Sequence, residues 1–493
     1  MSPLLFSGIV ASVQTSNLVS TGVAQGLPSR WKSKRVDVRL RETPSTALTD
    51  PYPAGLLNAG TNEKTPSPLR FAPPRPPGYK SAGLPNRRSD VMKRCLAVFL
   101  QIVALLILLS HPCIADEPRK QRQLPTLLTI EWKKGPNLPQ GFQDSQGDII
   151  DGWLISAGGF CSGQKGVPGK PKTYPRGFLK NVWALNLKSP AKGWRELPAF
   201  PGDARQGMQA IAVNNQIYFW GGFSYSEPYC YRDGYRLSRQ ADGWKWDSLP
   251  PLPWPSTAAG LCAVGSGIFI TGGADYDVKQ FFSATDRNGK VERLGARLLS
   301  IDTDNLKAGW HELTPCPGTP RWVHAMAAVD RKLYVFGGAT GSDNAAKTTC
   351  TVVDNWKYDP TSCQWSRLAD LPIASGNFPS GAIVFKKRYI LLVGGYQYSN
   401  ILGPEGKLGP LYGTPQRRYP NNPMCSDIFV YDTKNGVFGR ATSLLLNNNL
   451  PMTVIHRGRM HLVGGEIQSA VIDQEHFGHH PDLYLVGTIR QGK

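Results

Sequence analysis

The stretch Asn214–Phe223, NNQIYFWGGF, decides the fold of this chain. A run of strand-forming aromatic and β-branched residues ends in a pair of glycines, which allow the backbone to turn at positive φ. One such pair is weak evidence, but the pattern recurs along the chain at intervals of 51 to 70 residues. The six copies are Gly158-Gly159, Gly221-Gly222, Gly272-Gly273, Gly337-Gly338, Gly394-Gly395 and Gly464-Gly465.

A signature that recurs at this spacing is typical of a kelch-type β-propeller. Each unit can be divided into four strands, a to d, with the glycine pair at the end of strand b. Strand d usually carries a Trp and ends in Leu-Pro, as in GWRELPAFP, Gly193–Pro201, whereas the fifth unit has Phe438 in place of the Trp. The sequence therefore predicts an all-β, six-bladed kelch β-propeller over residues 126–493.

The two ends of the repeat region complement each other. The last unit stops after strand c, and the stretch LLTIEWKKGPNLP, Leu127–Pro139, reads as a strand d with no preceding partners. Pairing of this N-terminal strand with the last blade would close the ring and remove an exposed sheet edge.

Upstream of the repeats, residues 92–115 have the features of a secretory signal. Lys93-Arg94 precede an apolar run, Leu96–Leu109, that is short for a membrane span, and a small-residue cleavage site ends at Ala115. Residues 1–91 are rich in Pro, Ser, Arg and Thr, and we expect them to be disordered or to precede the true start at Met92. The predicted location is therefore periplasmic or secreted, with membrane attachment only if the signal is not cleaved.

The net charge of +20 is spread along the chain, and the propeller region has no dense run of Lys and Arg. Nucleic-acid binding is therefore not expected, and a small anionic ligand suits the mildly basic surface better. Binding to a partner protein is also compatible with this surface. Cys350 and Cys363 flank one predicted strand and could form a bridge in an oxidising compartment, whereas Cys262 is expected in the core.

The loops that follow strand b and those that precede strand a open on one face of a propeller, which we call the mouth. The long insertions all fall there, and loops on a rigid scaffold often carry ligand contacts; drift of tolerant surface loops is the alternative. These insertions are Phe160–Lys180, Phe223–Gly234, Ala274–Arg297, Tyr396–Cys425 and Glu466–Pro481.

The second unit, GWRELPAFPGDARQGMQAIAVNNQIYFWGGF, resembles the corresponding blade of the periplasmic sialic acid mutarotases, also called N-acetylneuraminate epimerases. The insertion after ITGGADYD, the insertion before CSDIFVYD and the final VGGE extend the resemblance more loosely across the propeller. The resemblance implies a mutarotase with a cleaved signal peptide. It also shows a departure, because the fourth unit, FGGATGSDNAAKTTC, lacks the Glu and Arg that this family has there and offers only Asp343 and Lys347.

Mutarotation of an acidic sugar needs a base, an acid and a cation for the carboxylate. We predict catalytic roles for Asp343, His324 and Glu466. The predicted substrate-binding residues at the mouth are Arg205, Arg321, Lys347, Asp275 and Asp277.

Each of these residues also has a structural interpretation. Arg205 and Arg321 could bind carbonyl groups between blades, and His324 could be a satisfied rim histidine. Glu466 could cap its turn, and Asp275 and Asp277 could be solvated loop residues. The run EHFGHHPD, with His476, His479 and His480, suggests a metal site, but no helix is predicted there, so we predict no metal and no cofactor. The alternative function is a kelch module that binds carbohydrate or protein without catalysis.

Overall fold

The computed structural model describes residues 124–163, 174–278, 281–285, 291, 293–341, 349–372, 375–378, 382–397, 400–402, 424–468 and 470–492. The predicted signal segment 92–115 and the upstream residues 1–91 lie outside these ranges, so both stay predictions. In the part of the chain that the structure describes, no helix has the length and apolarity needed to cross a membrane.

Six four-stranded antiparallel sheets, one for each repeat, confirm the predicted propeller. Five blades are contiguous in sequence and run a-b-c-d from the innermost strand outward. Their strands are β2 (Ile149–Ile150), β3 (Trp153–Ala157), β6 (Val182–Asn186) and β7 (Trp194–Glu196) in blade one; β8 (Gln206–Val213), β9 (Gln216–Phe223), β10 (Gly234–Gln240) and β11 (Gly243–Leu249) in blade two; β12 (Gly260–Val264), β13 (Gly267–Thr271), β16 (Leu298–Asp302) and β17 (His311–Leu313) in blade three; β18 (Ala325–Val329), β19 (Lys332–Phe336), β22 (Asn355–Asp359) and β23 (Gln364–Leu368) in blade four; and β24 (Ile383–Phe385), β25 (Tyr389–Val393), β27 (Ile428–Asp432) and β28 (Val437–Arg440) in blade five.

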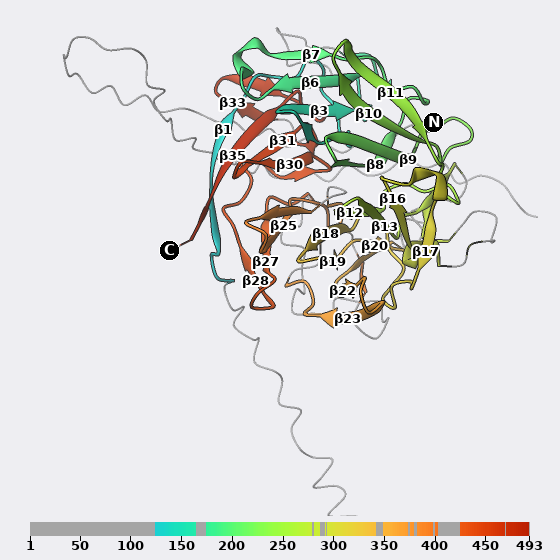
Figure 1. The fold of residues 1–493 in the computed structure, drawn as a ribbon. Helices are drawn as coiled ribbons and strands as arrows, with labels where there is room; N and C mark the ends of the chain where they lie inside the picture. The colour runs from blue at the N-terminus through green and yellow to red at the C-terminus, as the bar shows by residue number, and fades with distance from the viewer. Residues whose placement is uncertain are drawn as a thin grey trace, which may run out of the picture. The chain divides into compact units, whose positions relative to one another are not determined.

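The sixth blade joins the two ends of the repeat region, as predicted. Its strands β30 (Met452–His456), β31 (Arg459–Val463) and β35 (Tyr484–Gln491) come from the C-terminal end, and the outer strand is β1 (Leu128–Lys134). The register runs from Leu128 opposite Gln491 to Lys134 opposite Leu485. In Figure 1 the cyan β1 lies along the red β35. This pairing leaves neither end of the ring with an incomplete blade.

The glycine pairs connect each blade to the next. The N–H of the second glycine donates to the carbonyl of the residue that precedes the next inner strand, as Gly159 does to Arg205 and Gly222 does to Ser256, at 2.9 and 3.0 Å. The same bond closes the ring, because Gly465 donates to Phe142 of blade one at 2.9 Å. Both glycines of each pair have positive φ, for example +66° and +96° at Gly221 and Gly222, which explains the repeated choice of glycine.

The Trp residues of strand d fill the boundaries between blades, as predicted. The indole of Trp132 donates to the carbonyl of Ser443, and the indoles of Trp194, Trp246 and Trp365 donate in the same way to Pro136, Pro198 and Thr314. Phe438 takes this place in blade five, where it packs on Phe336 and Tyr431. Apolar packing thereby holds each blade to its neighbour, and at four of the boundaries an indole hydrogen bond is added.

The loops at the mouth contain additional short strands. Two of them, β21 and β26, pair in parallel between blades four and five. The set comprises β4 (Phe160–Cys161), β5 (Gly177–Phe178), β14 (Asp275–Asp277), β15 (Phe281–Ser283), β20 (Ala339–Thr340), β21 (Cys350–Val352), β26 (Asn400–Leu402), β29 (Asn448–Asn449), β32 (Glu466–Ile467), β33 (Ala470–Ile472) and β34 (Glu475–Phe477), with the 3₁₀ turn η2 (Leu294–Ala296). The 3₁₀ turns η1 (Pro190–Lys192) and η3 (Leu306–Ala308) connect strands c and d on the opposite face.

Six left-handed residues form a ring at the mouth: five lie shortly before the inner strand of their blade, and Gly207 is the second residue of β8. Backbone bonds link neighbours around it: Ala258 donates to Gly207, Val323 to Ala258, and Asp144 to Leu450, at 2.7 to 3.1 Å. All six φ values lie between +47° and +67°. The residues of this left-handed ring are Asp144, Gly207, Ala258, Val323, Asn377 and Leu450.

No two of the seven cysteines in the described part of the chain form a disulfide with each other. The bridge that the spacing of Cys350 and Cys363 allowed is therefore not formed: Cys350 is buried in β21, whereas Cys363 lies exposed in the turn between β22 and β23. Cys262 packs in the core of blades three and four, as predicted.

Candidate functional site

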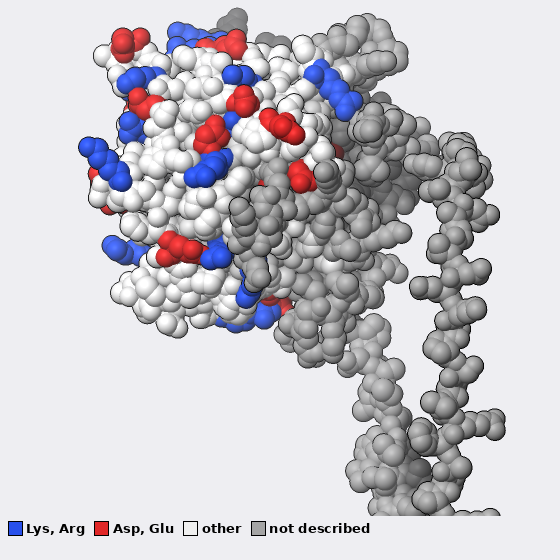
Figure 2. All heavy atoms as spheres, turned by 90° about the vertical axis from the view of Figure 1, so that its right-hand side faces the viewer, with Lys and Arg blue, Asp and Glu red and all other residues white. Residues whose placement is uncertain are grey.

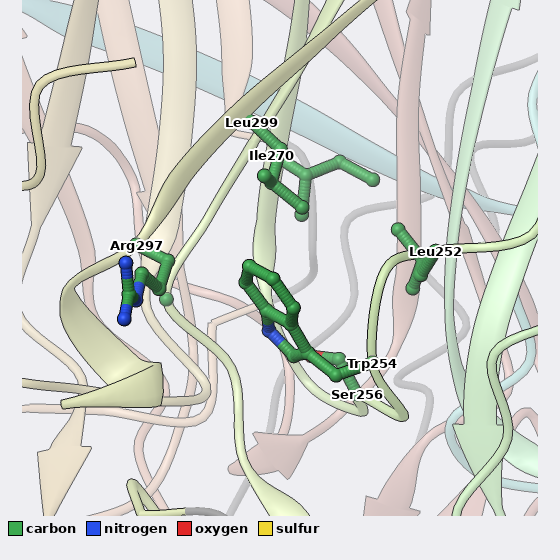
Figure 3. A pocket seen from close by; sticks show the side chains of 7 residues that line it. Leu252, Trp254, Ser256, Ile270, Arg297 and Leu299 are labelled. Carbon is green, nitrogen blue, oxygen red and sulfur yellow. The ribbon is translucent and has the colours of Figure 1, made fainter. Parts of the chain in front are cut away.

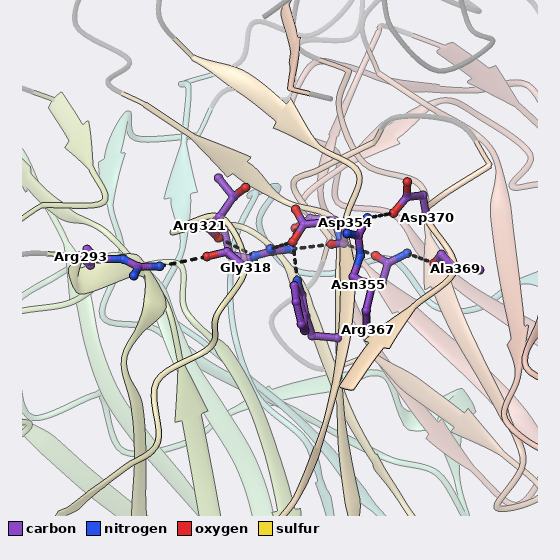
Figure 4. Close-up of polar contacts among 11 residues, drawn as sticks. Arg293, Gly318, Arg321, Asp354, Asn355, Arg367, Ala369 and Asp370 are labelled. Carbon is purple, nitrogen blue, oxygen red and sulfur yellow. Dashed lines mark hydrogen bonds and ion pairs between the residues drawn. The ribbon is translucent and has the colours of Figure 1, made fainter. Parts of the chain in front are cut away.

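Arg205 and Arg321, predicted to bind substrate, lie buried in their own blades. The side chain of Arg321 is 2% exposed and donates to the carboxylate of Asp354 at 2.5 Å, to the Asp354 carbonyl at 2.7 Å and to the Gly337 carbonyl at 3.2 Å. Figure 4 shows this group with the neighbouring Asn355–Ala369 and Arg367–Asp370 contacts. Burial raises the pKa of Asp354, but the Arg321 charge together with hydrogen bonds from Trp356 and Arg321 outweighs burial, and the net pKa is lowered. The contacts of Arg321 are therefore internal to blade four.

Arg205 makes the same contacts in blade two. It donates to Asp233 at 2.5 and 3.1 Å and to the Gly221 carbonyl at 3.2 Å, and its guanidinium lies 3.6 Å from the ring centre of Tyr231. Asp233 is 37% exposed, so this pair meets water on one side. We call each Arg–Asp arrangement a tie, because it joins the loop before the inner strand to the glycine turn and strand c of the same blade.

Blade three lacks this tie. Ser256 occupies the position of Arg205 and Arg321, because its carbonyl accepts the Gly222 bond, and Arg297 occupies the position of Asp233, because its carbonyl accepts the Gly272 bond. Blade three thus has a serine where the other two blades have the arginine, and an arginine where they have the aspartate. A cavity of about 10 Å³, enough for one water, lies between Trp254, Ser256 and Arg297 (Figure 3). Arg297 pairs with Glu312 instead. This cavity is too small for a sugar.

His324, predicted as a catalytic residue, is enclosed in the boundary between blades three and four. A Cβ atom on Gly260 or Gly272 would collide with its imidazole, and neither ring nitrogen has a hydrogen-bond partner among the described residues. Burial lowers its pKa to about 3, with a further contribution from Arg321. Met208 holds the corresponding place in blade two, where it lies against Gly158 and Gly222. His324 is thus a neutral packing residue in this structure.

Glu466, the third predicted catalytic residue, lies at the mouth in β32 with partners on both carboxylate oxygens. Asn449 Nδ2 donates to Oε2 at 2.7 Å, and His479 Nε2 lies 3.0 Å from Oε1. His479 is oriented by its Nδ1, which donates to the Ile467 carbonyl at 3.0 Å. The Glu466 side chain is 20% exposed and that of His479 is 41% exposed, so the pair can be reached from solvent.

The pair is charge-separated. Burial raises the pKa of Glu466 and lowers that of His479, but their mutual attraction and hydrogen bond outweigh burial in both. The net result is a lowered pKa for the carboxyl and a raised pKa for the imidazole. Glu466 is therefore a carboxylate at neutral pH, and His479 tends toward the cation.

The Glu466, His479 and His480 side chains place their ligand atoms within 4.8 Å of one another, which raises the question of a metal. His480 Nδ1 accepts the Ser162 N–H at 2.9 Å, so the neutral ring carries its proton on Nε2 and has no free lone pair. The cluster thus offers two usable ligands, fewer than the three or four of a zinc site. This donor set does not fit a metal centre.

The other predicted site residues divide into two groups. Asp275 is buried in β14, and Asp277 at its end is partly exposed. Asp343 and Lys347 lie outside the described residues, so their predicted roles stay predictions. An aromatic cluster adjoins β14. Tyr276 packs on Phe223, and the ring centre of Tyr225, which is 55% exposed, lies 4.8 Å from that of Phe178.

Asp144 was missed in the sequence analysis. It is a member of the left-handed ring, is 8% exposed and accepts a hydrogen bond from Gln146 Nε2 at 3.3 Å. Burial raises its pKa to about 7, and hydrogen bonds from Gln146 and the Gly207 backbone oppose this shift in part. Its position in the repeat could have revealed it. When the six repeats are aligned, Asp144 in GFQDSQGD, Gly141–Asp148, falls where blade two has Gly207.

The surface charge is mixed on the side of the propeller drawn in Figure 2. Lys and Arg alternate with Asp and Glu over the described residues of that side. Cationic groups near the Glu466 cluster are His479 and the exposed Arg176, whose guanidinium lies 6.0 Å from the ring centre of Phe160.

Comparison with known proteins gives two kinds of match. A family model described as the KLHDC2/KLHL20/DRC7 Kelch-repeats domain matches residues 207–465. An N-acetylneuraminate epimerase of Haemophilus influenzae is 23% identical over 360 residues, which cover 67% of this chain and 87% of that protein. One from Yersinia enterocolitica is 41% identical over 70 residues, 14% of this chain and 18% of that protein. The human Kelch repeat and BTB domain-containing protein 13 is 30% identical over 143 residues, 29% and 26% of the two chains.

Proposed function

Because this chain belongs to the kelch-repeat family and is distantly related to the N-acetylneuraminate epimerases, we propose that it exchanges the anomers of an acidic sugar. The substrate class is supported by the names of the relatives, which act on N-acetylneuraminate. The observation that carries the proposal is the Glu466–His479 pair, a carboxylate and a cation held side by side at the mouth.

The chemistry begins with the anomeric hydroxyl. Glu466, ionised at neutral pH, accepts its proton while the bond from the anomeric carbon to the ring oxygen breaks and an acid protonates that oxygen. Arg176 is the cation we assign to the sugar carboxylate, in place of Arg205 and Arg321, whose donors bind Asp233 and Asp354, while His479 stays paired with Glu466. Asn449 keeps the Glu466 carboxylate oriented through its 2.7 Å hydrogen bond.

Export is part of the proposal and is supported by the signal-like segment 92–115. Cleavage after Ala115 would give a mature chain that starts at Asp116. N-terminal sequencing of the protein from its native host tests this, and a peptide from residues 1–91 in the mature protein would contradict it.

The activity is tested by proton NMR exchange between the two anomers of N-acetylneuraminate in the presence of the protein. We expect acceleration over the buffer rate, reduced about 100-fold or more in Glu466→Gln. Glu475→Gln is the matched control, because Glu475 lies in the same insertion and pairs with Lys134 and Asn137 instead. Sugar line broadening without acceleration would favour the non-catalytic binding module.

A further inference from the structure

The left-handed ring contains a single acid among its six residues. Five positions hold Gly207, Ala258, Val323, Asn377 and Leu450, and the sixth holds Asp144. A non-glycine residue with positive φ is uncommon, and such positions concentrate at functional sites. The repeat does not require an acid here, since five blades form the same ring without one.

The Asp144 carboxyl lies in an environment of neutral hydrogen-bonding groups. Its Oδ2 lies beside Gly207 of blade two, where a Cβ atom would be at an ordinary contact distance of 3.4 Å, and the Gly207 backbone hydrogen-bonds the carboxyl. Gln146 donates to Oδ1, and none of the described Lys, Arg or His side chains forms an ion pair with it. The carboxyl is thus buried without a countercharge, and this favours its protonated form.

Amide side chains with unused acceptors adjoin the same place. Gln209 is fully buried, donates to the Gly207 carbonyl at 3.1 Å and leaves its Oε1 without a partner among the described residues. Gln143, next to Asp144, donates weakly to Gln206 at 3.5 Å and likewise leaves its Oε1 unpaired. A buried acceptor without a donor is costly, so the surroundings of Asp144 are polar and incompletely hydrogen-bonded.

Asp144 is also connected to the Glu466 cluster across the boundary between blades six and one. Its N–H donates to the Leu450 carbonyl at 3.1 Å, and the residue before Leu450 is Asn449, which holds Glu466. Asp144, through its backbone N–H, and Glu466, through its carboxylate, therefore both contact the short segment Asn449–Leu450.

We propose that Asp144 is the general acid of this propeller and that it acts with Glu466 as a proton-transfer pair across the closure of the ring. This inference rests on the proposed function. As Glu466 takes the anomeric proton, Asp144 gives its proton to the ring oxygen and the ring C–O bond breaks. The open-chain sugar then rotates about the bond next to its carbonyl carbon and recloses. Glu466 returns its proton to the carbonyl oxygen, and the hydroxyl formed from the ring oxygen returns its proton to Asp144. No proton is gained or lost overall.

The environments of the two acids suit these roles. The pKa of Asp144, raised to about 7 by burial, keeps it protonated up to neutrality, while the lowered pKa of Glu466 keeps it ionised over the same range. A pair of carboxyl groups with pKa values moved apart in this way is the pattern expected of an acid and a base.

The test is the pH profile of anomer exchange in the full chain and in Asp144→Asn, from pH 5 to 9. Asparagine is tolerated at this backbone position, because Asn377 occupies it in blade five with φ of +55°. We expect the wild-type kcat/KM to fall as pH rises through about 7 and the variant to be about 100-fold slower without this descending limb, while it still binds the sugar by saturation-transfer NMR.

The matched control is Asp330→Asn, an exposed left-handed aspartate in the turn after β18, which should keep the wild-type rate and profile. A wild-type rate and profile in Asp144→Asn would overturn the inference, as would loss of sugar binding in that variant. Absence of exchange in the wild type would instead overturn the proposed function on which the inference rests.

Discussion

Blades two and four enter their inner strands through the same four positions, Arg205–Met208 and Arg321–His324. Both arginines form the tie, yet Asp354 is 11% exposed whereas Asp233 is 37% exposed. Both final residues fill a blade boundary, one with a thioether and the other with an imidazole that has no partner among the described residues. Residue types that suggest catalysis in one copy of a repeat can thus be explained by the position they share with another copy.

The largest effect is expected when the tie of blade four is broken. Arg321→Met leaves the Asp354 carboxylate buried without its cation, and we expect a loss of about 3–5 kcal/mol in the free energy of unfolding. Arg205→Met should cost less, about 1–2 kcal/mol, because water can reach Asp233. Urea denaturation at pH 7 measures both.

The double variant Arg321→Met/Asp354→Leu is the control for the tie, since it removes both charges. It should recover most of the lost stability. Equal losses for Arg205→Met and Arg321→Met would contradict the difference that we draw between the two blades.

The second effect concerns the left-handed ring, where blade one has Asp144 and blade five has Asn377. An acid with a raised folded pKa contributes stability below its unfolded pKa, near 3.8, and this is lost as pH rises through about 7. Asp144→Asn should therefore be more stable than the wild type at pH 8, by at most about 4 kcal/mol, and show less pH dependence between 4 and 8. A constant difference from pH 4 to 8 would show that the carboxyl titrates normally.

The smallest effect tests the blade boundary. His324→Met copies Met208 and removes a buried unsatisfied N–H, so we expect about 1–2 kcal/mol of added stability at pH 7. A histidine with a depressed folded pKa loses stability as pH falls below its unfolded value near 6.5, so the gain should grow by about 2 kcal/mol at pH 5. Met208→His is the reciprocal variant, and a stabilising effect there would contradict the equivalence of the two boundaries.

The fold was predictable from local signals that the repeat enforces. The glycine pairs are required by positive φ at every turn, and the lone strand around Trp132 matched the missing strand of the last blade. Glu466 was found at the mouth because it directly follows a glycine pair. Each of these signals depends on backbone geometry that recurs six times.

The site was less predictable because its contacts depend on residues far apart in the sequence. Asp233 and Asp354, which hold the two arginines, lie 28 and 33 residues from them. His479 reaches Glu466 only because its insertion folds back on Ile467. No local sequence pattern marks Asp144. It is buried without a countercharge because of how neighbouring blades pack around it.

The central claim is that the chemistry belongs to the closure between blades six and one. The direct test is the anomer exchange rate of N-acetylneuraminate for Glu466→Gln beside Asp343→Asn, the fourth-blade acid predicted from sequence. The account predicts a rate lowered about 100-fold or more by Glu466→Gln and a much smaller change with Asp343→Asn. Exchange that survives Glu466→Gln and is lost with Asp343→Asn would contradict it and place the acid–base chemistry in blade four.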